Sequence, residues 1–287
     1  MTENRTYRHE YKYLVSAAQI PVLQARVAHL MQPDPHAGAD GQYRIRSLYY
    51  DDAQDRCLQD NEIGVDRKAK YRIRIYNGSD ARIRLELKQG LRGKKHKASD
   101  PLSRALADQL IAGTYIRGLG SPSGLDAAAF QENATTFREN SDDFRGNSDN
   151  FWENDDDGST AIGNYGDAAK AGQSGKRFQV LPGFCADMMV NRMHPAIIVE
   201  YDRTPFIYRY GNVRVTFDQN ISSSRDFEHF FCEQIHRRPI MPAGMHLMEV
   251  KFDEFLPDVI YRALQLEQLR QTTFSKYYLC RIYAGWT

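Results

Sequence analysis

Charged and apolar side chains alternate with a period of two between Tyr71 and Lys88. Side chains of a β-strand point to alternate faces of its sheet, so residues 71–76 and 82–88 predict two strands, each with one apolar and one charged face. The Asn77-Gly78 dipeptide between them favours a tight hairpin turn. The charged face contains Arg72, Arg74, Arg82, Arg84, Glu86 and Lys88. Such a dense cationic row indicates a charged interior that binds a polyanion.

Similar patterns recur along the chain and predict an α+β protein. Further strands are expected at residues 7–15, 43–50, 196–203, 204–210, 212–218 and 246–252. Helices are expected from just after Ser16 to residue 31, at 101–112, from Pro257 onward and at 275–283. Because most connections suit antiparallel pairing, we expect a closed antiparallel β-barrel of about eight strands with flanking helices.

The composition changes between residues 120 and 176, where Gly, Asn, Asp and Ser dominate. A seven-residue repeat starts there at Phe130, Phe137, Phe144 and Phe151. One Phe per repeat cannot form a coiled-coil seam, which needs two apolar positions. Residues 120–176 are therefore predicted to be a disordered polar insertion within a single domain of residues 1–287. Nine acidic residues against two arginines between 130 and 157 leave open a second interpretation, in which the insertion mimics polyphosphate or competes for the basic site.

The bulk composition narrows the functional classes. The 287 residues carry a net charge of +1, which gives no indication of nucleic-acid binding, so a cationic site must arise from local placement. The four cysteines are scattered without metal-ligand spacing, which favours reduced cytosolic thiols over disulfides or zinc. A polar N-terminal segment and the lack of a long apolar run predict neither a signal peptide nor a transmembrane helix. We expect a cytoplasmic protein.

Strand parity assigns a second group of residues to the same charged interior. The group contains Glu10, Lys12, Arg203, Arg214, Thr216, Asp218, Glu249, Lys251 and either Glu200 or Tyr201. Arg44 and Arg46 fit an interior and a surface position equally well. Guanidinium and ammonium groups bind phosphate oxygens, and carboxylates such as Glu10, Glu86 and Glu249 are suitable ligands for hard divalent cations. The sequence contains neither a Walker A motif nor a protein kinase signature.

Eight short segments between residues 8 and 277 together form a family pattern. They are Arg8-His-Glu-Tyr-Lys-Tyr, Ser47-Leu-Tyr-Tyr-Asp, Lys70-Tyr-Arg-Ile-Arg-Ile-Tyr, Leu85-Glu-Leu-Lys, Glu200-Tyr-Asp-Arg-Thr-Pro-Phe, Val213-Arg-Val-Thr-Phe-Asp, Met248-Glu-Val-Lys-Phe and Phe274-Ser-Lys-Tyr. In this order they resemble the vacuolar transporter chaperone (VTC) domain, a polyphosphate polymerase family within the triphosphate tunnel metalloenzymes. One segment alone is a weak signal, whereas eight in order are specific.

The resemblance implies a tunnel barrel that polymerises the γ-phosphate of ATP into inorganic polyphosphate, with Mn²⁺ or Mg²⁺ as cofactor. The residues implied to hold the triphosphate and the growing chain are Lys12, Arg72, Arg74, Lys88, Arg203, Arg214 and Lys251. Those implied at the tunnel wall or mouth are Tyr201, Ser275 and Lys276, with a loop lysine among Lys94, Lys95 and Lys97. Glu249 is the implied metal ligand, and Glu10 and Glu86 are further candidates. Export of the product would require a membrane partner.

The first strand departs from the hydrolytic relatives of this family. It has Glu10 and Lys12, but Arg8 stands where their ExExK motif requires a glutamate. This departure favours the polymerase branch and weakens Glu10 as a metal ligand. Two alternatives remain, namely a triphosphatase or nucleotide cyclase on the same fold, and a non-catalytic polyphosphate-binding module. Glu249 argues against the binding module, because anion binding alone has little use for an interior carboxylate.

Overall fold

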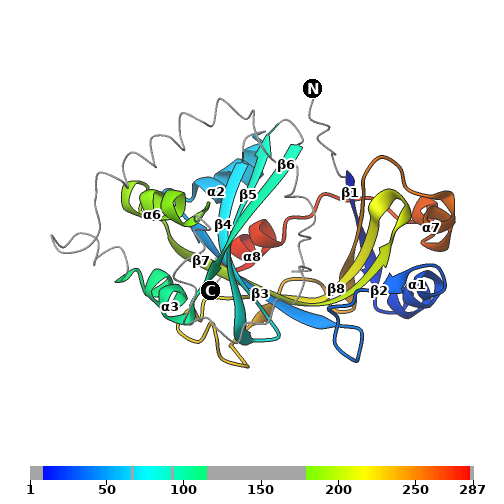
Figure 1. The fold of residues 1–287 in the computed structure, drawn as a ribbon. Coiled ribbons are helices and arrows are strands. Elements are labelled where there is room, and N and C mark those ends of the chain that lie inside the picture. The colour runs from blue at the N-terminus through cyan, green and yellow to red at the C-terminus, as the bar shows by residue number, and fades with distance from the viewer. Residues whose placement is uncertain (1–8, 66–67, 92–93, 115–178, 285–287) are drawn as a thin grey trace, which may run out of the picture.

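The computed structural model describes residues 9–65, 68–91, 94–114 and 179–284, so the predicted insertion at 120–176 lies outside the described residues. Its centre is an antiparallel sheet of ten strands (Figure 1). The eight longer strands are β1 (His9–Ser16), β3 (Tyr43–Asp51), β4 (Lys68–Tyr76), β5 (Ser79–Leu91), β6 (Lys94–Leu102), β7 (His194–Tyr208), β8 (Val213–Ser224) and β10 (Met245–Phe252). Their hydrogen-bonded order is β1-β10-β8-β7-β3-β4-β5-β6. The two-residue strands β2 (Gln32–Pro33) and β9 (Arg238–Pro239) pair with β7 and β8.

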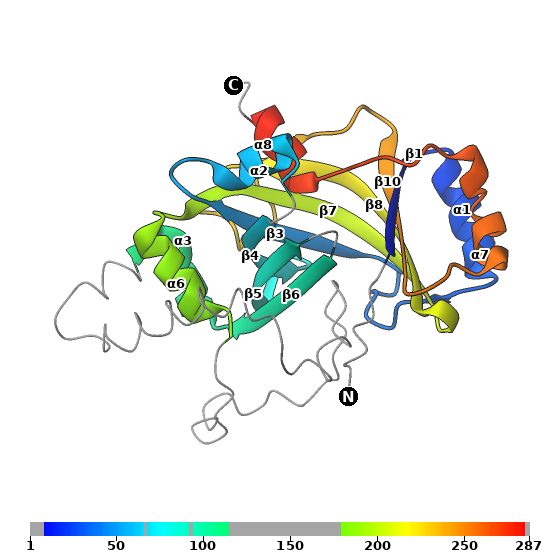
Figure 2. The same ribbon diagram turned by 90° about the horizontal axis from the view of Figure 1, so that it is seen from above.

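The predicted closed barrel is wrong. Among the described strands, β1 and β6 form the two ends of the strand order and do not pair with each other. Figures 1 and 2 show a strongly curved but open sheet that bends around α8 (Lys276–Ala284). Closure would require the two end strands to exchange main-chain hydrogen bonds, and side-chain alternation within single strands carries no information about that pairing. The α+β class, with helices flanking the sheet, is confirmed.

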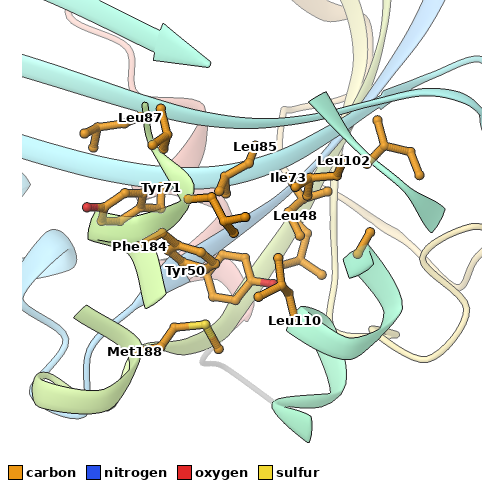
Figure 3. Close-up of a cluster of buried hydrophobic side chains, with 14 of the residues drawn as sticks. Leu48, Tyr50, Tyr71, Ile73, Leu85, Leu87, Leu102, Leu110, Phe184 and Met188 are labelled. Carbon is orange, nitrogen blue, oxygen red and sulfur yellow. The ribbon is translucent and has the colours of Figure 1, made fainter. Parts of the chain in front are cut away.

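Helices cover the apolar face of the sheet at both of its ends. α3 (Arg104–Ala112) and α6 (Leu181–Val190) pack on β4 and β5, where Ile73, Leu85 and Phe184 belong to one buried cluster (Figure 3). At the other end, α1 (Gln19–Ala28) and α7 (Asp258–Ala263) cover β8 and β10 through residues such as Val27 and Val250. The charged faces of these strands are therefore turned the other way.

α8 lies against the opposite side of the sheet. Its Tyr277 packs in a third buried cluster with Ile45 of β3 and Val199 of β7. We call this side the inner face; it contains Lys12, Arg72, Arg74, Arg203 and Glu249. The described chain also contains α2 (Arg56–Ile63) and the short 3₁₀ turns at Tyr210–Asn212 and Leu266–Gln268.

Several element boundaries test the sequence-based expectations directly. The hairpin at Asn77-Gly78 is confirmed, since both residues have positive φ angles of 53° and 68°, as a tight I′ turn requires. The two strands expected at 196–210 are one strand, β7, which continues through Pro205. Pro205 is tolerated because it lies between Arg203, the last residue paired with β3, and Phe206, the first paired with β2, so its missing N–H is not needed there.

The segment expected to supply a loop lysine among Lys94, Lys95 and Lys97 instead belongs to a pair of strands. β5 continues to Leu91, and β6 runs from Lys94 to Leu102. The helix expected from Pro101 begins later, at Arg104, because Ser103 caps it by accepting a hydrogen bond from the backbone N–H of Leu106. Lys94, Lys95 and Lys97 therefore lie on a strand and not on a loop.

Candidate anion-binding site

Strand register brings the charged residues of β1, β10 and β8 into rows on the inner face. Lys12 pairs with Glu249, which pairs with Thr216. Two residues further along both strands, Glu10 pairs with Lys251. Directly paired residues of antiparallel strands point to the same side of a sheet, so the alternation seen in each segment becomes one charged surface.

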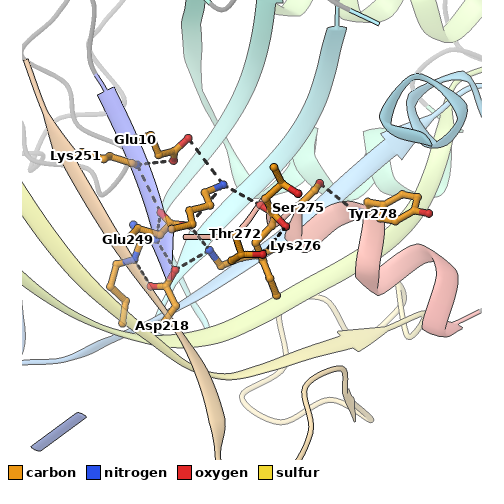
Figure 4. A network of polar contacts seen from close by, with 12 residues as sticks. Glu10, Asp218, Glu249, Lys251, Thr272, Ser275, Lys276 and Tyr278 are labelled. Carbon is orange, nitrogen blue, oxygen red and sulfur yellow. Dashed lines mark hydrogen bonds and ion pairs between the residues drawn. The ribbon is translucent and has the colours of Figure 1, made fainter. Parts of the chain in front are cut away.

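Two buried carboxylates, Asp218 and Glu249, lie at the centre of this surface (Figure 4). Nζ of Lys276 lies 2.7 Å from an oxygen of each. Arg203 binds Asp218 through two hydrogen bonds of 2.7 and 2.9 Å, and its Nη2 lies 3.6 Å from Glu249. The cations Lys12 and Lys251 lie 4.0 and 3.9 Å from Glu249.

The ionisation of this cluster follows from the excess of cations. Burial alone would raise the pKa of Glu249, but Lys276, Lys12, Lys251 and Arg203 together hold that pKa well below its ordinary value. Burial would lower the pKa of Lys276, and the carboxylates of Asp218 and Glu249 instead raise it. Glu249 and Lys276 are thus both charged at neutral pH, which suits the binding of a highly charged anion.

A second charged cluster lies on β4, β5 and β6. Nε of Arg72 donates to Oε2 of Glu86 at 2.6 Å, and Nζ of Lys97 lies 3.2 Å from the other carboxylate oxygen. Arg74 lies 4.0 Å from Glu86 and donates to the hydroxyl of Ser47. Burial would raise the pKa of Glu86, but Arg72, Arg74 and Lys97 lower it strongly. The oxygens of Glu86 are engaged by cations, so the structure places it as the counter-ion of this row.

α8 is fixed to the sheet by a buried aspartate. Asp51 accepts hydrogen bonds from the backbone N–H of Cys57 at 2.8 Å, from the hydroxyl of Tyr277 and from Arg281 at 3.3 Å. It therefore joins the start of α2 to α8. Since Tyr277 follows Lys276 directly, this contact holds Lys276 between the two carboxylates. Sequence reasoning missed Asp51, although it ends one of the family-like segments.

The last helix begins at the site itself. Ser275 accepts a hydrogen bond from the backbone N–H of Tyr278 and so caps α8. Nζ of Lys12 donates to the carbonyl oxygen of Phe274 at 2.9 Å. Tyr201 lies under two cations of the cluster, with Lys276 Nζ 4.8 Å and Arg203 Cζ 5.3 Å from its ring centre. The structure thus brings Tyr201, Ser275 and Lys276 together with the central cluster.

The other predicted site residues take varied positions. Arg214 is buried and donates to Asp34 at 2.7 Å and to the hydroxyl of Tyr43 at 3.2 Å. Lys88 pairs in register with Lys97 on β6. Glu10 lies 3.8 Å from Lys12 and 3.7 Å from Lys251. The backbones of Lys94 and Lys95 belong to β6, and their side chains lie outside what the structure describes.

Arg44, Arg46 and Glu200 lie on the opposite face of the sheet. Arg46 is fully buried and pairs with Glu200. It also donates to the carbonyl oxygens of Phe230, Cys232 and Glu233. Arg46 therefore lies neither on the charged inner face nor on the protein surface. It is buried on the opposite face of the sheet, where it binds the segment that follows β8. Of the two residues between which parity could not choose, Tyr201 faces the site.

Lys70 is an inner-face residue to which sequence reasoning gave no role. Its Nζ donates to the side-chain oxygen of Asn61 at 2.8 Å and lies 4.8 Å from the centre of the Tyr277 ring. Burial, assisted by the nearby charges of Lys68 and Lys12, lowers the pKa of Lys70 to about 8. Its spacing of two residues before Arg72 and four before Arg74 was the signal that could have identified it.

This pKa gives a direct prediction. At pH 8 about half of the Lys70 amines are neutral, whereas an ordinary lysine with a pKa of about 10.4 is almost fully charged. We expect amine-reactive labelling, followed by mass spectrometry over pH 6–11, to give a midpoint near 8 for Lys70. Tripolyphosphate should move the midpoint upward, since a bound anion favours the charged amine. A midpoint near 10.4 without ligand would contradict the burial argument.

The carboxylates allow a test of whether a divalent cation fits. Within the described residues, no group of three or more His, Cys, Asp or Glu side chains could enclose a metal ion. Mg²⁺ commonly binds one or two carboxylates and takes its remaining ligands from substrate phosphates and water. Glu249 and Asp218, both buried and both facing the cations, fit that mode of binding. Lys276 lies between them, so a metal bound to both would require this amine to move.

The chain is similar to a sequence family and to several solved structures. The model of the VTC domain matches residues 7–283, and no curated protein matches the sequence. Solved structures that are similar include a proposed adenylate cyclase from Bacillus halodurans (13% identity, 94% of both chains, TM-score 0.41). Another is a proposed adenylyl cyclase from Hippeastrum with a dominant triphosphatase activity (12% identity, 96% of both chains, TM-score 0.43). A third is the PH1819 protein from Pyrococcus horikoshii (11% identity, 97% of this chain and 99% of that one, TM-score 0.39).

The sequence predicts no transmembrane helix, and the helices of the structure can be compared with that prediction. Throughout the part of the chain that the structure describes, no helix combines the length and the apolar character needed to cross a bilayer.

The match to the family model covers nearly all of the sequence, including every element that contributes to the charged inner face. The chain belongs to the VTC domain family.

Proposed function

We propose that this protein is a polyphosphate polymerase that transfers the γ-phosphate of ATP to a growing inorganic polyphosphate chain. One observation carries the proposal: buried Glu249 is surrounded by four cations that come from four different elements. Lys12 belongs to β1, Arg203 to β7, Lys251 to β10 and Lys276 to α8. The same four cations also face Asp218 and Glu10, so four positive charges meet three carboxylates and a net positive charge remains available for an anion. Membership of the VTC domain family supports a triphosphate-related function.

The arrangement suits phosphoryl transfer because that reaction depends mainly on positioning and charge neutralisation. The residues that would bind phosphate oxygens are Lys12, Arg72, Arg74, Lys88, Arg203, Arg214 and Lys251, together with Lys276 at the centre of the first cluster and Lys97 in the second. Mn²⁺ or Mg²⁺ held at Glu249 would supply Lewis-acid stabilisation of the phosphate charge. Asp218 would hold Arg203 and Lys276 in place through the contacts described above.

The decisive experiment is incubation of the purified protein with ATP and Mn²⁺, with analysis of both products. ADP together with a ladder of long phosphate chains supports the polymerase. ADP or AMP with free phosphate or pyrophosphate, or a cyclic nucleotide, would instead identify a hydrolase or cyclase. Tight polyphosphate binding without turnover would identify a binding module. A reaction without divalent metal would contradict the role proposed for Glu249.

A further inference from the structure

The side chain of Thr216 presents an unusual buried group at the centre of the inner face. It is only 1% exposed, and its hydroxyl oxygen has no hydrogen-bond partner. Most buried polar groups in proteins are hydrogen-bonded, because an unpartnered one keeps the cost of leaving water. A valine would fill the same volume without that cost, so the hydroxyl calls for an explanation.

The position of Thr216 separates it from the other buried hydroxyls that lack a partner. Within the described residues these are Tyr50 and Thr204. Tyr50 lies in the apolar cluster beneath α6. Thr204 pairs with Phe217, which packs in the cluster under α1 and α7, so Thr204 lies on the apolar side of the sheet. Thr216 instead pairs with Glu249 and lies on β8 between Arg214 and Asp218.

The neighbours of Thr216 indicate which ligand its hydroxyl would meet. The nearby carboxylates are already engaged, since Asp218 binds Arg203 and Lys276 and Glu249 binds Lys276. The next residues along the face, Arg214 and Lys251, pair with each other in register and both carry positive charge. An anion held by these cations would place acceptor oxygens beside a hydroxyl that can donate a hydrogen bond.

We propose that Thr216 is a substrate-binding residue whose hydroxyl donates a hydrogen bond to a phosphate oxygen of the bound oligophosphate. This inference rests on the proposed function, because it assumes that the inner face binds phosphate. It adds a neutral donor to a row of cations. A cation attracts any anion, whereas a hydroxyl fixed on a strand favours an oxygen at one position.

The test is the Thr216→Val variant, with Thr204→Val as its matched control. Both substitutions replace a buried, unpartnered hydroxyl with a methyl group, so both proteins should unfold at the same or a higher temperature than the wild type. Only Thr216→Val should weaken tripolyphosphate binding, by about tenfold or more, since hydrogen bonds to charged groups contribute this much. Binding is measured by calorimetry in EDTA. Thr216→Ser keeps the hydroxyl and should bind within a fewfold of the wild type.

The outcomes separate this inference from the proposed function. If the wild type binds tripolyphosphate and Thr216→Val binds it equally well, Thr216 has no such role, while the polymerase proposal stands. If Thr216→Val weakens binding only when Mn²⁺ is present, the hydroxyl serves the metal, and the phosphate contact is wrong. If the wild type binds no tripolyphosphate either in EDTA or with Mn²⁺, both proposals fail. A marked loss of stability in Thr216→Val would show that the hydroxyl has a structural partner.

Discussion

The Glu249→Gln variant is expected to lose metal-dependent turnover by about 100-fold or more while it keeps the fold. Metal ions stabilise transition-state charge by several kcal/mol, which corresponds to rate factors of about this size. An amide has nearly the same shape as the carboxylate but is a poor ligand for a hard cation. The fold should persist because Asp218 still lies 2.7 Å from Lys276 and remains paired with Arg203.

The same variant gives a second, opposite readout. In EDTA, Glu249→Gln should bind tripolyphosphate at least as tightly as the wild type, because it removes a negative charge from a cationic surface. Steady-state kinetics with ATP and Mn²⁺ and calorimetry with tripolyphosphate measure the two effects. Glu200→Gln is the matched control, since Glu200 is similarly buried at 2% exposed against 4% but lies on the opposite face with Arg46. It should lower stability without removing the dependence on Mn²⁺. Full activity in Glu249→Gln would refute the metal role.

The Arg72–Glu86 pair is expected to dominate the stability of the second cluster. Either Arg72→Met or Glu86→Gln should lower the free energy of unfolding by about 3 kcal/mol, because removal of one partner leaves the other charge buried without its nearest counter-ion. The double variant should lose less than the sum of the two single losses, by about 1–3 kcal/mol. Urea denaturation of the four proteins measures this coupling, and purely additive losses would show that the pair is not coupled. Phosphate binding should fall in both variants that lack Arg72, whatever their stability.

The pH dependence of stability provides an independent check on this pair. The cations around Glu86 place its folded pKa far below its ordinary value. A carboxyl group with a depressed folded pKa stabilises the protein above its unfolded pKa of about 4.3, and the stabilisation is lost as the pH falls toward the folded pKa. The free energy of unfolding should therefore decline below about pH 4.3, and this decline should be shallower in Glu86→Gln. Equal slopes for the two proteins would contradict the assignment.

The sequence allowed correct prediction of features that depend on local alternation. The two faces of β4 and β5, the turn at Asn77-Gly78 and the inner-face position of Arg72 and Arg74 all follow from periodicity. Closure of the sheet did not follow, because it depends on contact between strands that are far apart in the chain. The position of Arg46 was predicted wrongly because the alternation of side chains along a strand separates the two faces of the sheet but does not show what covers each face. Here the segment from Phe230 to Glu233 covers it and supplies three carbonyl acceptors.

Local sequence patterns also could not predict the roles of residues that depend on contacts with other elements of the fold. Asp51 matters because Tyr277 and Arg281 reach it from α8, a contact that no spacing within β3 could indicate. The perturbed pKa of Lys70 likewise arises from Asn61 of α2 and Tyr277 of α8, which cover its amine. The resemblance to a family identified which charges belong together, and the structure adds the groups that hold them in place.

The contact between Lys12 and Phe274 has a consequence for the kinetics of folding. It joins residues 262 positions apart, and contacts of such long sequence separation form slowly because a large loop must close first. Partly folded chains would therefore lack the complete cation cluster. Polyphosphate would bind the finished fold in preference to its intermediates and shift the equilibrium toward it by mass action. The polymer that this protein is proposed to make would then also stabilise the folded state of the enzyme that makes it.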